Sequence, residues 1–176
     1  MSIQNNKYVI NLDVDGGDNA PSSVLNGAEL YLKDNQNVRF NLYGRKSIID
    51  FHIKNLPLLL NFSNIIDCEG VIDGNLKPTE AMKKEFRHSS LAKSISSLKN
   101  QPLEATVSSG NTGAMMAYSK VFLRTVENIS RPAIASLFPS KNHPVCFLDL
   151  GANSECDENN LYDFAIMGSI YYQILF

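Results

Sequence analysis

Strand-like and helix-like stretches alternate along this 176-residue chain, and the alternation restricts the possible folds more than any other feature. Six stretches have the character of strands, at residues 8–12, 38–43, 63–67, 103–107, 133–138 and 145–150. Apolar residues at helical spacing fill most of the intervals, at residues 21–32, 46–54, 79–86, 89–98, 114–123 and from about 158 onward. Such alternation predicts a mostly parallel sheet with helices on both faces. We expect one α/β domain over residues 1–176, because no repeat or linker interrupts the pattern.

The composition is that of an ordinary soluble protein and argues against several classes of function. Hydrophobic residues make up 44% and charged residues 19%, and the net charge of -2 gives no general attraction to nucleic acid. Three cysteines without C-x-x-C spacing predict neither a disulfide framework nor a zinc site. The N-terminus lacks signal-peptide character, and the densest apolar run, residues 56–60, is too short to span a bilayer. We expect a cytoplasmic protein without a metal, cofactor or nucleic-acid partner, and peripheral contact with a membrane stays open.

Polar residues cluster directly after three of the expected strands, at residues 13–19, 108–112 and 149–153. In open α/β sheets, ligands bind beyond the carboxyl ends of the strands. If the three strands share one sheet, their polar clusters converge on one edge. The sequence therefore predicts a ligand site there.

The segment that joins the strand ending at Val107 to the next helix contains two serines, an asparagine, a threonine and two glycines. The first turn of a helix has unpaired backbone N–H groups and a positive dipole end, which together favour an anion. Glycine lets a phosphate approach the backbone, and Ser109 or Thr112 can add a hydroxyl donor. An ordinary capped helix is the alternative interpretation, since serine, asparagine and threonine are common N-cap residues.

The loop after the first strand holds the carboxylates Asp13, Asp15 and Asp18 around two glycines. This loop predicts either a ligand-binding role for Gly16, Gly17 and Asp18 or a plain turn that leads into the helix at Pro21. A magnesium site is the weaker interpretation, because hard-cation sites usually recruit carboxylates from separate elements. No Walker A motif, G-x-G-x-x-G fingerprint or G-x-S-x-G elbow is present in the chain.

Four motifs in this order resemble the phosphate acyltransferase family of bacterial phospholipid synthesis. They are D-x-x-G-G-D at residues 13–18, S-x-G-N-T-G-A at 108–114, R-P-A-I-A at 131–135 and L-D-L-G-A-N at 148–153. The resemblance implies a three-layer α/β/α fold similar to those of phosphotransacetylases and isocitrate dehydrogenase-like enzymes, usually in a homodimer. It also implies transfer of a fatty acyl group from acyl carrier protein to inorganic phosphate. The acyl phosphate product would then be used by a membrane acyltransferase, which is a further expected partner.

The motifs and the chemistry of this reaction together give a set of expected site residues. For catalysis they are Asn111, Thr112, Lys141 and Asn153. For binding of phosphate and substrate they are Gly16, Gly17, Asp18, Ser108, Ser109, Gly110, Gly113 and Asp149. The backbone N–H groups of residues 110–112 are expected to hold phosphate, and Lys141 to offset its charge. Asn153 or the Gly17 N–H is expected to meet the thioester carbonyl oxygen.

Two departures from the family pattern bear on function. Asp15 places an additional carboxylate beside the expected anion site, which disfavours phosphate unless that carboxylate points away or is neutralised. The chain also stops on an apolar helical pattern at residues 170–176, short of the length of family members. We expect either a truncated fold or a terminal helix that is buried in a dimer. Two alternative functions follow, a half-enzyme that needs a second chain and a phosphotransacetylase-like enzyme that uses a coenzyme A thioester.

Overall fold

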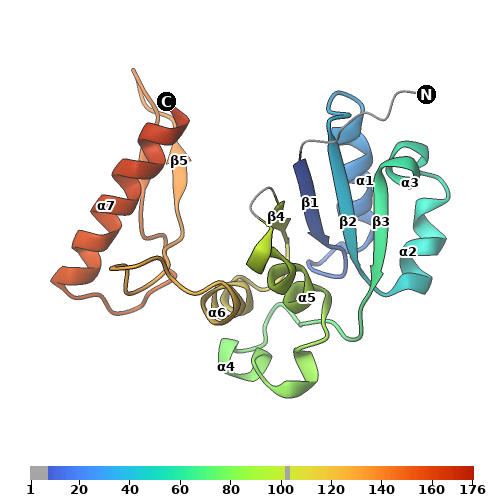
Figure 1. Ribbon diagram of the computed structural model, residues 1–176, viewed down its shortest axis with the longest axis horizontal. Helices are drawn as coiled ribbons and strands as arrows, with labels where there is room; N and C mark the ends of the chain where they lie inside the picture. Colours follow the sequence, from blue (N-terminus) through green and yellow to red (C-terminus); the bar gives the residue numbers. More distant parts are fainter. Residues whose placement is uncertain (1–7, 102–103) are drawn as a thin grey trace. The chain divides into compact units, whose positions relative to one another are not determined.

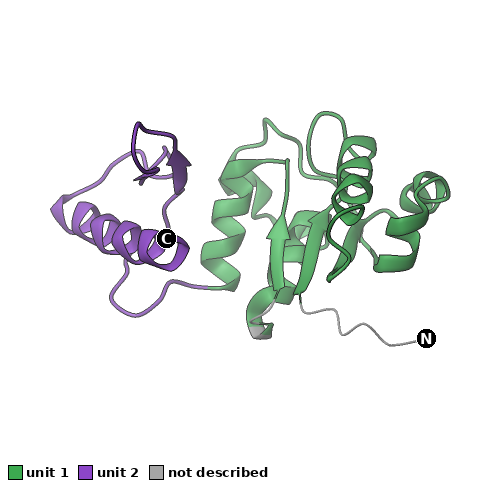
Figure 2. Cartoon of the chain, turned by 90° about the horizontal axis from the view of Figure 1, so that it is seen from above, with its two compact units in different colours: residues 1–123 green, residues 124–176 purple. Residues whose placement is uncertain are grey.

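The structure is a computed structural model that describes residues 8–101 and 104–176, and the chain divides into two compact units. Unit 1 extends to Leu123, and unit 2 comprises Arg124–Phe176 (Figure 2). Unit 1 contains a four-stranded sheet with several helices, and unit 2 contains a two-stranded sheet and the single helix α7 (Figure 1).

Unit 1 is built around four strands, with helices between them as the sequence predicts. The strands are β1 (Tyr8–Asp13), β2 (Val38–Gly44), β3 (Ser63–Asp67) and β4 (Glu104–Val107). The helices are α1 (Ser22–Leu32), α2 (Lys46–Ile53), α3 (Pro57–Phe62), α4 (Pro78–Ala81), α5 (Ser90–Ser97) and α6 (Thr112–Phe122), with 3-10 turns η1 (Lys84–Phe86) and η2 (Leu98–Asn100). The expected strand start at Leu103 lies outside the described residues.

All four strands of unit 1 run parallel, in the order β3-β2-β1-β4. Strands β1, β2 and β3 therefore lie side by side in chain order, and β4 pairs with the opposite side of β1. In register, Val9 of β1 lies between Arg39 of β2 and Glu104 of β4. The reversal makes the carboxyl ends of β1 and β4 a topological switch point, the place where open α/β sheets bind ligands.

The larger apolar core lies between the sheet and helices α1, α2 and α3. Leu25, Ala28 and Leu32 recur at helical spacing and give α1 a buried face. The buried side chains that meet this face from the strands and the other helices are Leu12, Val14, Val38, Phe40, Leu42, Ile49, Ile53 and Leu59. This packing supplies one outer layer of the three-layer α/β/α arrangement.

Helix α5 supplies the layer on the other face, where its contact with the sheet is largely polar. The Asn11 amide nitrogen of β1 donates to Ser97 Oγ and to Glu104 Oε2, at 2.9 Å each. The Asn41 amide of β2 in turn donates to Asn11 Oδ1 at 2.8 Å. These bonds satisfy a buried amide between two layers, where an unpaired polar group would be destabilising. A second apolar cluster, which includes Leu91, Ile95 and Tyr118, joins α4, α5 and α6.

Unit 2 contains a hairpin of β5 (Ser136–Phe138) and β6 (Val145–Phe147), followed by α7 (Glu158–Leu175). The expectation that these two strands belong to the parallel sheet is wrong, because they form a separate antiparallel pair. Residues 139–144 alone connect them, whereas a parallel pair needs a crossover of about a dozen residues. The polar cluster at 149–153 therefore does not follow a strand of the unit 1 sheet.

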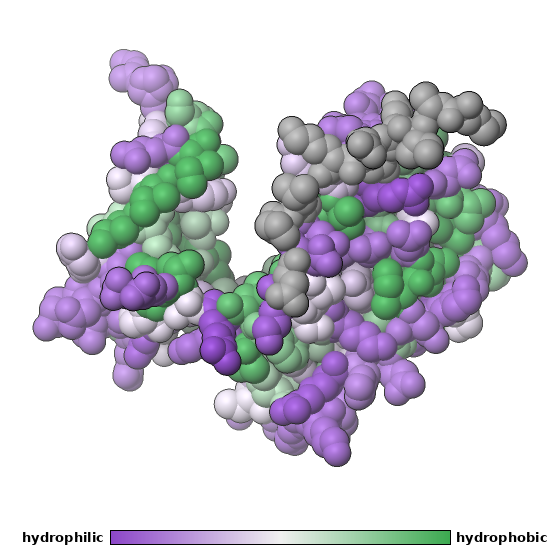
Figure 3. Space-filling view, in the orientation of Figure 1, coloured by the Kyte–Doolittle hydropathy of each residue, from purple (hydrophilic) through white to green (hydrophobic). Residues whose placement is uncertain are grey.

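Helix α7 begins with a capping box in which Asp157 and Asn160 exchange side-chain to backbone hydrogen bonds. Buried Asp163 fastens the helix to the start of unit 2 by accepting from the N–H and the hydroxyl of Ser130, at 3.0 and 2.9 Å. An apolar stripe runs along the exposed side of α7 and includes Ile170 and Ile174 (Figure 3). Within the described residues, no helix has both the length and the apolar character that crossing a membrane requires.

Candidate functional site

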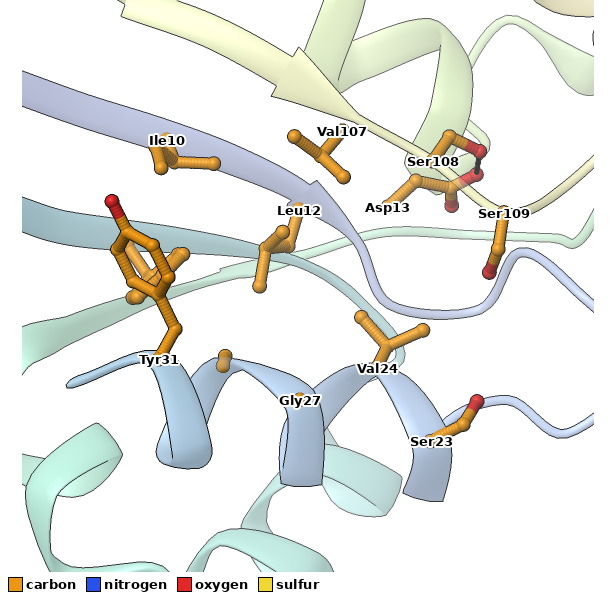
Figure 4. A pocket seen from close by; sticks show the side chains of 12 residues that line it. Ile10, Leu12, Asp13, Ser23, Val24, Gly27, Tyr31, Val107, Ser108 and Ser109 are labelled. Atoms are coloured by element: carbon orange, nitrogen blue, oxygen red, sulfur yellow. Dashed lines mark hydrogen bonds between the residues drawn. The ribbon is translucent and has the colours of Figure 1, made fainter. Parts of the chain in front are cut away.

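The carboxylate of Asp13 is the centre of the polar cluster at the switch point. It lies at the end of β1, is 1% exposed, and accepts hydrogen bonds from two serine hydroxyls. Ser108 Oγ, directly after β4, donates to Oδ2 at 2.6 Å (Figure 4). Ser90 Oγ, at the start of α5, donates to Oδ1 at 2.5 Å. One buried side chain thus fastens three segments that are far apart in sequence.

The environment of Asp13 favours its protonated form. Burial raises the pKa of this carboxyl above its ordinary value of 3.8, the hydrogen bonds from Ser108 and Ser90 oppose the rise, and the charge of Asp15 adds to it. Burial is the largest of these causes, so the pKa of the Asp13 carboxyl is raised despite the two serine donors.

Two glycines, Gly16 and Gly110, lie close to Asp13. A Cβ on Gly16 would lie 2.2 Å from Asp13 Oδ2, and one on Gly110 would lie 3.2 Å from the Gly16 Cα. Gly17 has a φ of +103°, which residues other than glycine rarely adopt. A Cβ added at this position would lie 2.5 Å from Ser109 Oγ. The loops after β1 and β4 are therefore packed against each other through their glycines.

Hydrogen bonds within the loop after β4 fix its path. Ser109 Oγ donates to the Gly16 carbonyl at 2.8 Å, and the Gly110 N–H donates to Ser108 Oγ at 3.0 Å. The sequence predicts the Gly110 N–H as a phosphate donor, but here it is bonded within the loop instead. Ser108 and Ser109 likewise use their hydroxyls to join the two loops.

Asn111 has a positioning role in the structure and is buried. Its Oδ1 accepts from the Ala114 N–H at 2.8 Å, so it is the N-cap of α6. Its amide nitrogen donates to the carbonyls of Asp73, Gly74 and Leu76, at 2.9, 3.1 and 2.8 Å. The side chain expected to be catalytic thus fastens the chain segment 73–76 to the start of α6.

Thr112 and Gly113 open α6 at the end of this loop. The first backbone N–H groups of a helix have no partner within the helix, so they and the dipole together attract anions. The Thr112 side chain is exposed. A Cβ on Gly113 would lie 2.6 Å from the Pro78 side chain, which explains glycine at this position. The switch point therefore presents an accessible helix N-terminus beside the Gly16–Gly17 turn.

Asp15 forms an ion pair with Arg45. Its side chain is fully buried, and both of its carboxylate oxygens bond to the Arg45 guanidinium, at 3.2 and 3.3 Å. The Arg45 backbone N–H adds a third bond at 3.0 Å. Asp18, in contrast, is exposed at the end of the same loop.

In unit 2, Asp149 organises the L-D-L-G-A-N motif. Burial disfavours ionisation of its carboxyl, but hydrogen bonds from the N–H groups of Ile134, Asn153 and Ala152 and from the Asn153 amide outweigh it and lower its pKa. The Asn153 amide also donates to the Pro132 carbonyl at 2.9 Å. Asp149 and Asn153 therefore join this motif to the R-P-A-I-A motif.

Lys141 is exposed in the turn between β5 and β6. Because the hairpin is antiparallel and Asp149 follows β6 at its other end, Lys141 and the Asp149–Asn153 pair lie at opposite ends of the hairpin. Within residues 8–101 and 104–176, no three His, Cys, Asp or Glu side chains are grouped to hold a metal ion.

Asp13, Ser90 and Arg45 of the unit 1 cluster are absent from the set of expected site residues. Ser90 lies in a serine-rich helix start, where nothing local indicates that its hydroxyl reaches the end of β1. Arg45 directly follows β2, which ends at Gly44, so it lies at the carboxyl edge of the sheet. Its position in the sequence could therefore have indicated that it belongs to the cluster.

Comparison with known proteins identifies a family for the chain. The model of a family described as fatty acid synthesis protein matches residues 8–176. A phosphate acyltransferase of Rhodospirillum rubrum is 42% identical over 166 residues, which cover 94% of this chain and 47% of that protein. Phosphate acyltransferases of Wolbachia pipientis and Ehrlichia canis are each 41% identical, covering 99% and 92% of this chain and 51% and 49% of their own lengths. The chain thus spans about half the length of the curated relatives it matches.

Proposed function

This chain belongs to the fatty acid synthesis protein family, and we propose from that membership that it takes part in acyl transfer to inorganic phosphate. The donor that we propose is a fatty acyl thioester of acyl carrier protein, and the product is an acyl phosphate for phospholipid synthesis. The names of its relatives support the acyltransferase class of this proposal.

The observation that carries the proposal is the helix N-terminus at the switch point of unit 1. The Asp13 carboxylate accepts a hydrogen bond from Ser108, Ser108 Oγ accepts one from the Gly110 N–H, and Asn111 caps α6. These bonds fix the first turn of the helix before any ligand binds. A preorganised set of N–H donors binds an anion without reorganising when the reaction occurs. Thr112 adds a hydroxyl at the same turn.

In the proposed reaction, a phosphate oxygen attacks the carbonyl carbon of the thioester. The carbonyl oxygen becomes an oxyanion, for which the Gly17 N–H is the proposed donor. When the oxyanion collapses, the carbon–sulfur bond breaks and the thiolate leaves with the electron pair. Phosphate is itself a nucleophile and a thiol with a reference pKa of about 8.5 leaves readily, so positioning is the main task of the protein.

The test is acyl phosphate formation from acyl-acyl carrier protein and phosphate. Thr112→Ala is expected to raise the KM for phosphate about tenfold, which corresponds to one lost hydrogen bond to a charged group. Thr125→Ala, which removes an exposed threonine outside the loop, is the matched control. An unchanged phosphate dependence in Thr112→Ala would contradict the proposed anion site.

A half-enzyme that needs a second chain is the second candidate. It is favoured by the coverage of only 47% to 51% of the three relatives. Turnover that appears only after the remaining half of a relative is added would support it. Parallel assays with acyl-coenzyme A distinguish the third candidate, a phosphotransacetylase-like enzyme. Assembly as a homodimer and delivery of the product to a membrane acyltransferase are further parts of the proposal.

A further inference from the structure

Ser90 is the first residue of α5, and the bond that its hydroxyl makes is unusual for a serine in this helix. Serines within a helix commonly donate to a backbone carbonyl of the preceding turn, as Ser94 does here at 2.9 Å. The N-cap of α5 is Ser89, whose Oγ accepts from an N–H of the first turn. Ser90 is 2% exposed and instead donates to Asp13 Oδ1 at 2.5 Å, although 77 positions separate the two residues. The stability of α5 itself therefore does not explain this hydroxyl.

The bond from Ser90 restrains the rotation of the Asp13 carboxylate. The last side-chain torsion of an aspartate has a broad distribution, so a carboxylate with a donor on one oxygen can still turn. In this chain each oxygen has its own hydroxyl donor, Ser90 on Oδ1 and Ser108 on Oδ2. The distances of 2.5 and 2.6 Å lie in the short range that is typical of hydroxyl donors to a carboxylate. The two serines together fix the plane of the carboxylate.

The effect of Ser90 extends to the loop after β4 through Ser108. Figure 4 shows the bond from the Ser108 hydroxyl to Asp13. Because the Ser108 proton points at Asp13, a lone pair of Ser108 Oγ accepts from the Gly110 N–H, at 3.0 Å. This second bond orients the backbone that leads into Asn111, the N-cap of α6. A chain of three hydrogen bonds thus connects the start of α5 to the backbone just before α6.

We propose that Ser90 is a positioning residue for phosphate, which acts through Asp13 and Ser108 on the backbone at the start of α6. Ser90 itself does not touch the phosphate. It keeps the carboxylate in the orientation that holds Ser108, and Ser108 in turn holds the loop. The inference rests on the function proposed above, because it concerns the same anion site.

Other contacts of α5 attach the helix to the sheet without Ser90. The Asn11 amide of β1 donates to Ser97 Oγ at 2.9 Å, and the Thr106 hydroxyl of β4 donates to the Ser94 carbonyl at 2.8 Å. The helix also contributes to the apolar cluster that it shares with α4 and α6. Removal of the Ser90 hydroxyl should therefore free the carboxylate while α5 stays in place.

The test compares Ser90→Ala with Ser94→Ala in the full 176-residue chain. Both substitutions remove a buried hydroxyl from α5, but the Ser94 hydroxyl bonds within its own helix and is the matched control. Hydrogen exchange is measured at the Gly110 amide, with the Leu42 amide of β2 as the reference for global unfolding. The dissociation constant of inorganic phosphate is measured by titration of the amide resonances. Ser108→Ala and the double variant Ser90→Ala/Ser108→Ala complete a cycle.

Ser90→Ala is expected to speed exchange at Gly110 about tenfold and to weaken phosphate binding about tenfold, the usual effect of one lost hydrogen bond to a charged group. Exchange at Leu42 should remain native, and Ser94→Ala should leave the Gly110 exchange and the phosphate affinity unchanged. In the Ser108→Ala background, Ser90→Ala should weaken phosphate binding no further, because residues of one hydrogen-bond network are not additive.

Four outcomes overturn the positioning role and leave the proposed function standing. They are native exchange and affinity in Ser90→Ala, equal effects of Ser90→Ala and Ser94→Ala, additive effects of Ser90→Ala and Ser108→Ala, and an equal acceleration at Leu42, which would reduce Ser90 to a stabilising residue. A native chain that binds no phosphate, or binds it regardless of Thr112→Ala, would instead overturn the proposed anion site and this inference with it.

Discussion

Asp13 and Ser108 meet at 2.6 Å although 95 positions separate them in the chain. Their contact joins the central strand β1 to the edge strand β4 at the point where the polar loops begin. Through Ser108 it also determines the direction of the Gly110 N–H, so a buried carboxyl far from α6 in sequence fixes the start of that helix.

This contact predicts a pH dependence of stability. Because the pKa of Asp13 is raised on folding, the stabilisation it contributes is fully present below its ordinary value of 3.8 and is lost as the pH rises through the native value. The free energy of unfolding of the native chain, relative to Asp13→Asn, should therefore fall as the pH is raised from 3 to 7. Urea unfolding at several pH values measures the difference, and a rising difference would contradict the assignment.

Gly16→Ala should be strongly destabilising. Its Cβ would lie 2.2 Å from a buried carboxylate oxygen, and overpacking of this kind typically costs about 1–3 kcal/mol. Gly27→Ala is the opposite control, because its Cβ meets nothing and alanine favours a helix over glycine by about 1 kcal/mol. Thermal unfolding of both variants should show melting temperatures on opposite sides of that of the native chain.

Arg45→Met should destabilise unit 1 by about 1–3 kcal/mol, since it leaves the buried Asp15 carboxylate with fewer donors. The guanidinium side chain is 47% exposed, so solvent screening keeps the effect within this range. Adding Asp15→Asn to Arg45→Met should recover part of the loss. Chemical denaturation of the native chain, the two single variants and the double variant measures these differences in stability. A double variant less stable than either single variant would contradict the Asp15–Arg45 ion pair.

Asn111→Ala and Asn111→Asp distinguish the two roles of this side chain, which are to accept a hydrogen bond as the N-cap of α6 and to donate hydrogen bonds to backbone carbonyls. Aspartate keeps the N-cap acceptor but cannot donate to the carbonyls of residues 73–76, whereas alanine loses both. At neutral pH aspartate should be less stable than alanine, because its second carboxylate oxygen replaces the amide nitrogen against the carbonyl oxygens of Asp73, Gly74 and Leu76. If both variants instead remain as stable as the native chain but lose activity, Asn111 acts in catalysis rather than in positioning.

Asp149 should show the reverse of the Asp13 trend. Its pKa is lowered in the folded chain, so its contribution is present above 3.8 and is lost as the pH falls through the native value. The stability advantage of the native chain over Asp149→Asn should therefore shrink on acidification below pH 4. Tryptophan is absent from the sequence, so circular dichroism is a suitable signal.

The sequence predicts unit 1 well, because its elements depend on local periodicity. Strands at 8–13, 38–44 and 63–67 and helices at 22–32 and 46–53 agree with expectation within a residue or two. The helix expected at 79–86 is divided into α4 and η1, because Lys83 adopts an extended backbone between them.

Contacts between distant residues explain what the sequence does not predict. The pairing of β5 with β6 depends on connection length, which the strand pattern does not encode. The roles of Ser90 and Arg45 depend on which strands are neighbours. In the loop after β4, sequence reasoning places the polar residues correctly at a helix start, but the direction of the Gly110 N–H depends on tertiary hydrogen bonds.

The strand order of unit 1 has a consequence for biosynthesis. β1 and β2 are close in sequence and can pair early, but the other side of β1 receives β4 only when residues 104–107 have emerged from the ribosome. Until then, the central strand of the finished sheet is an exposed edge, which is prone to aggregation. Translation through this interval is therefore the stage at which a chaperone would protect the nascent chain most effectively.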